Sequence, residues 1–450
     1  MAEQAFIDRT SNPTEKLEVL IFSNKEPSKN VDLSAGTIQF NYYESLFSDT
    51  IKADLTFIDS GDSVGVERGG SNVSVYQGLP LVGTERVEVV MKDNKQVAIG
   101  ESPKLKLYVN KINPQLSDNQ RNIVGLSLVS KEYLMDKKTN VNERFDGKIS
   151  DTIGVLLVDD KFIGTEKNVD IESTSNNFNF IGNNKHPMYL MNWLSKKSVS
   201  EQNQTLGESA GYFLYETYDG FKFKSIDGLF AQKPKKSYIY NNTELLPAGY
   251  DGKALTYKKD NNVHAESKFK FGAYHTRAIL FDPFTTFYEV REKQVDQEQL
   301  TMGGKELPTL NPEFDRELDS FTRTSYFVLD TGTMPAGTSE QQLEKSKEEN
   351  FPYADIANQA NQRYNQFVSA KASITISGDF SLRAGDAIFL DVPKLESEQT
   401  TTVDPTDGGL YIITELCHFI STKGTFTKLN LVRDSFGRSG NHTLNRTGVA

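Results

Sequence analysis

Cysteine, histidine and tryptophan are scarce in this chain of 450 residues. Cys417 is the single cysteine, so no intrachain disulfide can form, and the composition is typical of proteins that fold in a reducing compartment. Because Cys417 stands in a strand-like run, we expect its thiol to be buried as a small apolar group. The histidines are scattered and none forms a His-x-x-x-His pair: His186, His264, His275, His418 and His442. With thiolate clusters also excluded, we expect no metal site.

Signals for export, membrane insertion and common catalytic machinery are also missing. The N-terminus has no basic region followed by an apolar one, and no apolar run is long enough to span a bilayer. The sequence contains no Gly-x-x-x-x-Gly-Lys-Ser/Thr and no Gly-x-Ser-x-Gly. The glycines of 61–70 fit no dinucleotide pattern and predict a flexible loop. We therefore predict a protein that is not an enzyme, with no catalytic, cofactor-binding or metal-binding residues.

Charge is biased towards acid, with a net charge of −11 and a pI near 5.2, which argues against a surface that binds nucleic acid. The basic run 233–236 is interpreted as a solvated turn. The alternating acids of 313–319 lack the glycine and glutamate offsets of an EF-hand loop and are interpreted as a solvated segment. Paired carboxylates for glycoside hydrolysis stay open, because only their separation in space identifies them.

What the chain does contain is aromatic and strand-like. With 28 Phe, 19 Tyr and 37% hydrophobic residues, it has enough apolar side chains for a β-rich globular fold. A chain of this length predicts two to four domains.

Two stretches, 52–129 and 371–434, carry the same ordered series of short segments. The distance from Gly83 to Tyr108 is 25 residues, and that from Gly385 to Tyr411 is 26. The matched segments are Lys52-Ala53-Asp54-Leu55-Thr56-Phe57 with Lys371-Ala372-Ser373-Ile374-Thr375-Ile376, Leu81-Val82-Gly83-Thr84-Glu85 with Leu382-Arg383-Ala384-Gly385-Asp386, Leu107-Tyr108-Val109 with Leu410-Tyr411-Ile412, and Leu126-Ser127-Leu128-Val129 with Leu429-Asn430-Leu431-Val432. Fixed spacing over several segments indicates a duplicated antiparallel β-unit, although any two β-segments share some pattern.

Local patterns divide the rest of the chain. Further strands are predicted at 17–22, 38–43, 237–240, 268–274, 278–281 and 324–329. Helices are predicted from Ile149 behind a Ser150 cap, over 187–197 with Pro187 at its start, and over 357–368. A hairpin is predicted over 212–226, turning at Asp219-Gly220.

These patterns give a mainly β protein with an α+β insert: two related antiparallel β-barrel or tube-like domains, plus smaller helix-containing domains. The predicted boundaries are 1–135 for the first barrel, 136–232 for the insert, 233–350 for a β-rich middle region that contributes in part to the second barrel, 351–436 for a helix and that barrel, and 437–450 for a polar tail.

Several of these segments resemble the central hub protein of the baseplate of contractile-tailed bacteriophages, which is related to the hub part of injection-system spike proteins. The similar segments are Tyr43-Glu44-Ser45-Leu46-Phe47 with Leu79-Pro80-Leu81-Val82-Gly83-Thr84-Glu85, Phe145-Asp146-Gly147-Lys148-Ile149, the hairpin Phe213 to Ile226, and Gly385-Asp386, Gly409-Leu410-Tyr411-Ile412, His418 and Leu431-Val432-Arg433-Asp434. The resemblance covers about half of the chain and is weak through 234–350.

The resemblance implies a structural virion protein: a homotrimeric hub that adapts the sixfold tail tube to the threefold central spike and forms part of the DNA channel. Implied partners are further copies of the chain, the spike trimer, the tail tube or tube-initiator protein, and the tape-measure and wedge proteins. DNA would be passing cargo only, and the protein would be assembled in the host cytoplasm and located in the virion tail. Because the chain is acidic, we expect a channel that repels DNA.

Two other functions stay open. A β-rich adhesin or receptor-binding module would expose aromatic side chains at loop tips. A carbohydrate hydrolase would cleave polysaccharide, although no motif identifies its acids.

Overall fold

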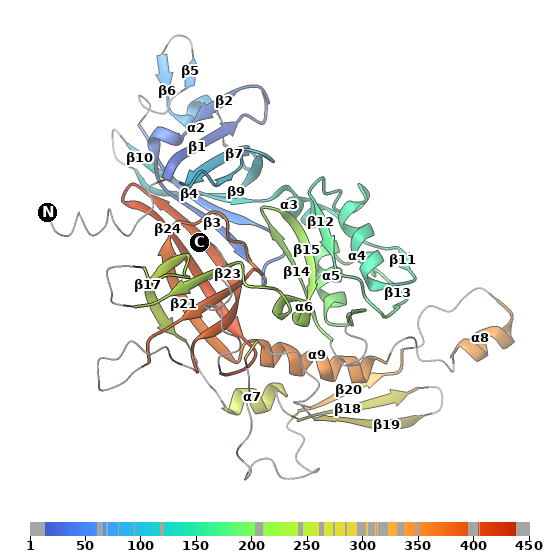
Figure 1. Cartoon of the computed structure of the whole chain (residues 1–450). Helices are drawn as coiled ribbons and strands as arrows, with labels where there is room; N and C mark the ends of the chain where they lie inside the picture. Colours follow the sequence, from blue (N-terminus) through green and yellow to red (C-terminus); the bar gives the residue numbers. More distant parts are fainter. Residues whose placement is uncertain are drawn as a thin grey trace.

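The computed structural model describes most of the chain, and the structural statements below refer to this part. The described residues are 14–60, 66–68, 71–79, 81–93, 95–117, 121–202, 210–241, 246–260, 265–272, 275–283, 286–294, 303–304, 311, 313, 323–330, 337–346, 350, 352–394, 404 and 406–437. Two β-units lie next to each other, the first blue and the second orange to red with a yellow-green strand, and a green insert packs beside both (Figure 1).

The first unit is a six-stranded antiparallel arrangement in the order β1-β7-β9-β10-β4-β3. Its strands are β1 (Thr14–Phe22), β3 (Thr37–Ser45), β4 (Lys52–Asp59), β7 (Arg86–Asp93), β9 (Leu105–Ser117) and β10 (Asn122–Val129). Smaller elements decorate it: β2 (Asn30–Asp32), η1 (Ser34–Gly36), β5 (Val66–Arg68), β6 (Ser71–Val73), α2 (Val75–Gly78) and β8 (Ala98–Ile99). No pairing joins β1 to β3 among the described residues, so this unit stays open at that edge.

The second unit is a closed barrel in the order β16-β22-β23-β24-β21-β17, with β17 returning to β16. Its strands are β16 (Lys236–Ile239), β17 (Gly252–Lys259), β21 (Ala370–Ser377), β22 (Ala387–Asp391), β23 (Gly409–Ser421) and β24 (Gly424–Arg433). The middle region therefore supplies two strands of this barrel. The expectation of two related barrel-like domains is confirmed.

The repeated segments form strands because their apolar residues alternate. In β4 and β21, every second side chain is buried, including Leu55 and Phe57 in the first and Ile374 and Ile376 in the second. These side chains belong to one core that runs through both units. The polar alternates face away from that core.

The two units match residue by residue. The equivalent partners are Leu55 with Leu126 and Ala53 with Leu128 in the first unit, and Ile374 with Leu429 and Ala372 with Leu431 in the second. Both units also carry bulges at equivalent places: at Asn110 and Thr414 in the third strand of the repeat, and at Ile38 and Leu255 in the strand beside β4 or β21. Shared bulges are strong support for a duplicated unit.

The turn before β7 and β22 is equivalent too, but not as the sequence comparison aligned it. Thr84 N–H donates to Val109 C=O (2.7 Å), and Gly385 N–H donates to Ile413 C=O (2.8 Å). Thr84 and Gly385 both have positive φ, 69° and 84°. Thr84, rather than Gly83, is therefore the counterpart of Gly385.

Tyr108 likewise corresponds to Ile412 rather than Tyr411, since Tyr108 lies opposite Arg86 as Ile412 lies opposite Ala387. The sequence comparison relied on nearly constant spacing and was wrong by one residue at both places, because the intervening loops differ in length.

The insert between the units contains α3 (Lys131–Lys138), α4 (Ile149–Val158), α5 (Pro187–Ser195), α6 (Ile226–Phe230) and the strands β11 (Arg144–Phe145), β12 (Val169–Ile171), β13 (Phe180–Ile181), β14 (Tyr212–Thr217) and β15 (Gly220–Ser225). The predicted helices and hairpin are confirmed, and α3 was not predicted. Two details were wrong. Lys148, not Ser150, occupies the N-cap position of α4. Ser150 lies inside the helix, and its N–H donates to Thr174 Oγ1 (3.0 Å). The hairpin loop is Tyr218-Asp219, because Gly220 already pairs with Thr217.

The remaining elements are a small sheet, called the arm below, and three helices near it. A three-stranded sheet, β19-β18-β20, consists of β18 (His275–Asp282), β19 (Phe287–Gln294) and β20 (Arg323–Val328). Helix α9 (Tyr353–Phe367) runs from this arm to the second barrel, with α7 (Ala265–Phe271) beside it and α8 (Ser339–Ser346) further out (Figure 1). The helix predicted over 357–368 is confirmed. The strand predicted over 268–274 is wrong, because residues up to Phe271 are helical and pack on α9 and β20.

Candidate functional site: the seam between the two β-units

Strand β3 of the first unit pairs with β23 of the second, which makes one continuous sheet of the two units. Tyr43 lies opposite Cys417, and Gln39 lies opposite Ser421 at the far end of the same ladder. On its other edge β3 pairs with β4 of its own unit. We call this junction of β3 and β23 the seam. It consists of main-chain hydrogen bonds between two strands that are far apart in the sequence.

Strand β23 holds this seam because it is long enough to pair twice along one edge. Its residues 409–412 pair with β22 of its own barrel, and residues 415–421 pair with β3. Between them, at the bulge, Thr414 C=O accepts from Leu46 N–H (2.8 Å). The bulge therefore marks the point where the strand passes from its own barrel to its neighbour.

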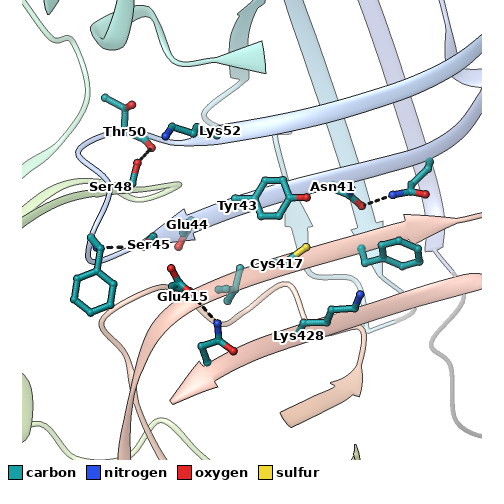
Figure 2. Close-up of a pocket in the computed structure, with 15 residues that line it drawn as sticks. Asn41, Tyr43, Glu44, Ser45, Ser48, Thr50, Lys52, Glu415, Cys417 and Lys428 are labelled. Carbon is teal, nitrogen blue, oxygen red and sulfur yellow. Dashed lines mark hydrogen bonds between the residues drawn. The ribbon is translucent and has the colours of Figure 1, made fainter. Parts of the chain in front are cut away.

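A cavity of about 660 Å³ lies on the polar face of the sheet, across the seam. Figure 2 shows Asn41 and Tyr43 on β3 facing Cys417 on β23 and Lys428 on β24, with Ser48 and Thr50 at the loop end. Asn430 Nδ2 donates to Glu415 (2.6 Å), and Lys428 Nζ lies 4.8 Å from the Phe419 ring centre. This surface is polar, and non-covalent contacts connect its side chains.

Two titratable groups at the seam, Tyr43 and Cys417, are kept neutral by burial. Burial raises the pKa of Tyr43 to about 12 and that of the Cys417 thiol to about 11. Lys428 lowers the pKa of Cys417 in opposition, but burial outweighs it. A protonated thiol is a poor nucleophile, so this site carries no activated cysteine. Cys417 is half-buried, and the expectation of a buried thiol is corrected to that extent.

The polar face extends over the strands of both units. Its charged residues include Lys52, Lys111, Lys258, Lys371 and Lys428 with Asp54 and Glu415. Equivalent positions make equivalent contacts: Ser127 donates to Asp54 (3.0 Å) in the first unit, and Ser373 donates to Asn430 (2.9 Å) in the second. This face was not predicted as a site, although the polar alternates of each repeat were visible in the sequence.

The other features singled out in the sequence do not join this site as catalytic groups. His418 is buried between Tyr42 and Phe380, and His186 Nδ1 lies 2.9 Å from Thr139 C=O. Lys233 and Lys235 are exposed, as a solvated turn requires. Lys236 belongs to β16 and pairs with Asp379, so the interpretation was wrong for that residue, and Lys235 also pairs with Asp386.

Several predicted features lie outside the described residues: the side chains of His264, His275 and His442, most of 61–70 and most of 313–319. In the described part, no cluster of three metal-ligating side chains occurs, and no helix is long and apolar enough to cross a bilayer.

The sequence matches no family model and no curated protein. Solved structures do match. The 43 kDa tail protein of prophage MuSo2 from Shewanella oneidensis superposes with a TM-score of 0.53 at 11% identity, covering 94% of this chain and 100% of that one. This chain has the fold of a phage tail protein.

Further matches are the tail protein from Neisseria meningitidis MC58 (TM-score 0.49, 9% identity, 92% of this chain and 96% of that one) and the E. coli c3393 protein (TM-score 0.42, 7% identity, 90% and 76%). The latter is a component of the type VI secretion system with structural similarity to the T4 bacteriophage tail proteins gp27 and gp5. The superposition on the MuSo2 tail protein confirms, at the level of the fold, the resemblance found in the sequence.

Proposed function

We propose that this chain is the structural hub subunit of a contractile-tail baseplate, and that three copies form a ring that adapts a sixfold tube to a threefold spike. The observation that carries the proposal is the seam. Two equivalent units meet through two particular strand edges, β3 and β23. Among the described residues, part of the counterpart edge of each has no strand partner: β17 beyond Lys253 and β9 beyond Tyr108.

The residue equivalence of the two units identifies which strand edges correspond to β3 and β23. Strand β17 is the counterpart of β3, and β9 is the counterpart of β23. Among the described residues, β17 pairs beyond Lys253 only with β21, and β9 pairs beyond Tyr108 only with β10. Exposed strand edges are templates for pairing with another chain. Joining β17 of one copy to β9 of the next repeats the seam between chains.

Such a contact is head to tail, so it generates a closed ring when the rotation between units divides a full turn. Three chains with two units each present six similar units, which is what a junction between sixfold and threefold partners requires. The register of the seam predicts the register between chains: Tyr43 opposite Cys417 translates to Asp260 opposite Asn113. Pro114 lacks an N–H donor, so this ladder has one bond fewer than the seam within the chain.

In this ring the polar face of the sheet lines the channel, together with the turns that lead into β7 and β22. This face carries the lysines and the two carboxylates named above. The acidic channel expected from the net charge of the chain is therefore not part of the proposal, because these lysines face the proposed channel. Transient contact of DNA phosphates with these lysines is the consequence.

The proposed partners are the spike trimer below the ring, the tail tube or its initiator above it, and the tape-measure and wedge proteins, with DNA as passing cargo. The proposed location is the virion tail, after assembly in the host cytoplasm. The hub acts by geometry and carries out no catalysis.

Native mass spectrometry and a cysteine pair test the proposal. In a Cys417→Ser background, Asn113→Cys with Asp260→Cys places two thiols at directly opposed positions of the predicted ladder, within the reach of a disulfide. We expect oxidation to give covalent dimers and trimers. The control pair, Asn113→Cys with Lys258→Cys, is two residues out of register and should cross-link far less.

The two parts of the proposal fail differently. A trimer that cross-links equally through both pairs contradicts the edge pairing but keeps the ring. A monomer at micromolar concentration, with and without spike protein, contradicts the ring itself.

One observation favours a receptor-binding function. Tyr326, Phe287 and Tyr288 are 76%, 67% and 63% exposed, and they lie on the two outer strands of the arm sheet. They are on or beside strands rather than at loop tips. Binding of the purified protein to host cells, lost on Tyr326→Ser, would support that alternative.

A further inference from the structure

The turns that lead into β7 and β22 are built in the same way; we call residues 81–85 the first turn and residues 382–386 the second turn. In each, the backbone N–H of the second residue, Val82 or Arg383, donates to the carboxylate three residues later (2.7 and 2.8 Å). The C=O of that acidic residue accepts a bond of 3.0 Å from a neighbouring strand in both turns. Val82 is therefore the counterpart of Arg383.

The second turn is buried against the first unit and the insert. Arg383 is only 6% exposed, and its guanidinium lies over the Tyr218 ring, 5.1 Å from the ring centre. Ala384 N–H donates to the carboxylate of Glu44 at the end of β3 (2.9 Å). The second turn therefore lies at the end of the seam and adds a contact between the units that the strand ladder does not supply.

The first turn presents an apolar side chain to solvent on a rigid support. Val82 is 80% exposed, whereas Leu81 and Glu85 are buried below it. Asn24 Nδ2 donates to Gly83 C=O (2.9 Å) and fixes the turn from the side. A single exposed valine is common on protein surfaces, but this one stands where the second unit makes its contact with a neighbour. A side chain ordered in advance loses little conformational freedom when a partner covers it.

The first turn does not fit the site that the second turn occupies. A Cβ added at Gly385 would lie 2.2 Å from Tyr215 Oη, and Tyr215 is itself buried. That site therefore has no room for a side chain at this position unless Tyr215 moves. Thr84, the counterpart of Gly385, carries a Cβ, so the surface that receives the first turn is not the end of β3 and the insert of another copy.

The end of β17 is the surface that remains for the first turn in the proposed ring. Tyr42 on β3 lies opposite Ala53. Lys259 on β17 lies opposite Ala372, the counterpart of Ala53, so Lys259 occupies the place of Tyr42 in the second unit. Lys259 is exposed, and its Nζ donates to both carboxylate oxygens of Asp407 (2.7 and 2.8 Å). With the ammonium paired in this way, the aliphatic stem of the lysine offers apolar surface to a valine.

We propose that the first turn is a docking element for a second copy of this chain, and that Val82 packs against the stem of Lys259 at the end of β17 in the next copy. The inference rests on the ring proposed above and names a contact in it that lies outside the strand ladder. The two turns then have the same task at different junctions. The second turn closes the seam within the chain, and the first turn closes the junction between chains.

Maleimide labelling of single cysteines tests the contact in a Cys417→Ser background. In the single chain, Val82 is 80% exposed and Val158 on α4 is 56% exposed, so Val82→Cys should react at least as fast as Val158→Cys. In protein that native mass spectrometry shows to be trimeric, we expect Val82→Cys to react about tenfold more slowly than Val158→Cys, because the next copy covers the first turn.

A charge on the first turn gives a second readout. Val82→Lys removes the apolar contact and places an ammonium against Lys259 of the next copy. Each contact between chains should weaken about tenfold, which corresponds to about 1.4 kcal/mol, as measured by native mass spectrometry over a dilution series. The control Val158→Lys, on the exposed face of α4, should assemble like the unmodified chain. The thermal midpoints of both variants show whether they are folded.

The outcomes separate this contact from the ring itself. A trimer in which Val82→Cys reacts as fast as Val158→Cys overturns the docking of the first turn and leaves the ring intact. A folded Val82→Lys protein that assembles as tightly as the unmodified chain does the same. A chain that stays monomeric, with and without spike protein, overturns both the ring and this contact.

Discussion

The carboxylate of Glu44 in the first unit accepts a hydrogen bond (2.9 Å) from the backbone N–H of Ala384 in the second unit, 340 residues away. Its other oxygen accepts from Tyr218 N–H in the insert hairpin (2.8 Å) and from Tyr42 Oη (2.8 Å). Burial raises the pKa of Glu44, while Arg383 and these donors favour the charged form. One buried side chain therefore ties both β-units and the insert together.

Glu44→Ala should destabilise the protein strongly. Two backbone donors and a hydroxyl would lose their acceptor in the interior, at a cost of about 1–3 kcal/mol for each group that stays unpaired. Glu44→Gln keeps one oxygen acceptor and should lose less. Thermal unfolding and limited proteolysis between the units measure the effect, with the exposed Glu415→Ala as control. If Glu44→Ala and Glu415→Ala shift the midpoint equally, Glu44 does not join the units.

Arg363 on α9 makes ion pairs with Asp227 of the insert and with Asp434 after the second barrel (3.3 Å to the latter). All three side chains are buried. Arg363→Met should cost about 3–5 kcal/mol, because it leaves two buried carboxylates without their cation. Adding Asp227→Asn to that variant should recover part of the loss. Urea unfolding at pH 7 checks both, and a loss below about 1 kcal/mol in the single variant would contradict the mechanism.

His418 should make the fold sensitive to acid. Burial, with help from Arg383, lowers the pKa of His418 to about 3, from an unperturbed value of 6.5. As the pH falls below 6.5, the unfolded chain takes up a proton that the folded protein refuses until about pH 3. The stability contributed by neutral His418 is present above pH 6.5 and is lost progressively towards pH 3, by about 2 kcal/mol between pH 7 and pH 5.

His418→Gln retains a polar partner for Thr427 but does not titrate in this range. We expect its stability to differ less between pH 7 and pH 5 than that of the unmodified chain, as measured by denaturant unfolding at the two pH values. Equal pH dependence in both proteins would mean that other groups set the acid sensitivity.

Cys417 should react slowly with alkylating reagents. Because burial raises the pKa of this thiol to about 11 from its ordinary value of 9.0, its thiolate fraction at pH 8 is roughly 100-fold below that of an unperturbed thiol. The rate with iodoacetamide should rise about tenfold per pH unit up to pH 10. The urea-unfolded chain is the control, and since this is the only cysteine, whole-protein mass reports on it alone. Native and unfolded rates within threefold of each other would contradict the burial of the thiol.

The sequence determined those features that depend on local periodicity. Alternating residues such as Leu55 and Phe57 predicted strands, Pro187 marked the start of a helix, and the repeated segments indicated a duplicated unit, because each pattern is fixed by residues a few positions apart. The strand predicted over 268–274 was wrong for the same reason. The pattern of a short segment fits either a strand or a helix, and packing on α9 decides between them.

Only the tertiary structure decided which edges meet. The backbone N–H and C=O groups that join β3 to β23 are the same in every residue. The side chains therefore do not indicate that Tyr43 lies opposite Cys417. Bulges and loop lengths shifted the equivalence of Tyr108 by one residue, and Lys235 and Lys236 pair with buried acids that lie about 150 residues away. Long-range pairing depends on how the chain closes on itself, and a linear sequence records that only indirectly.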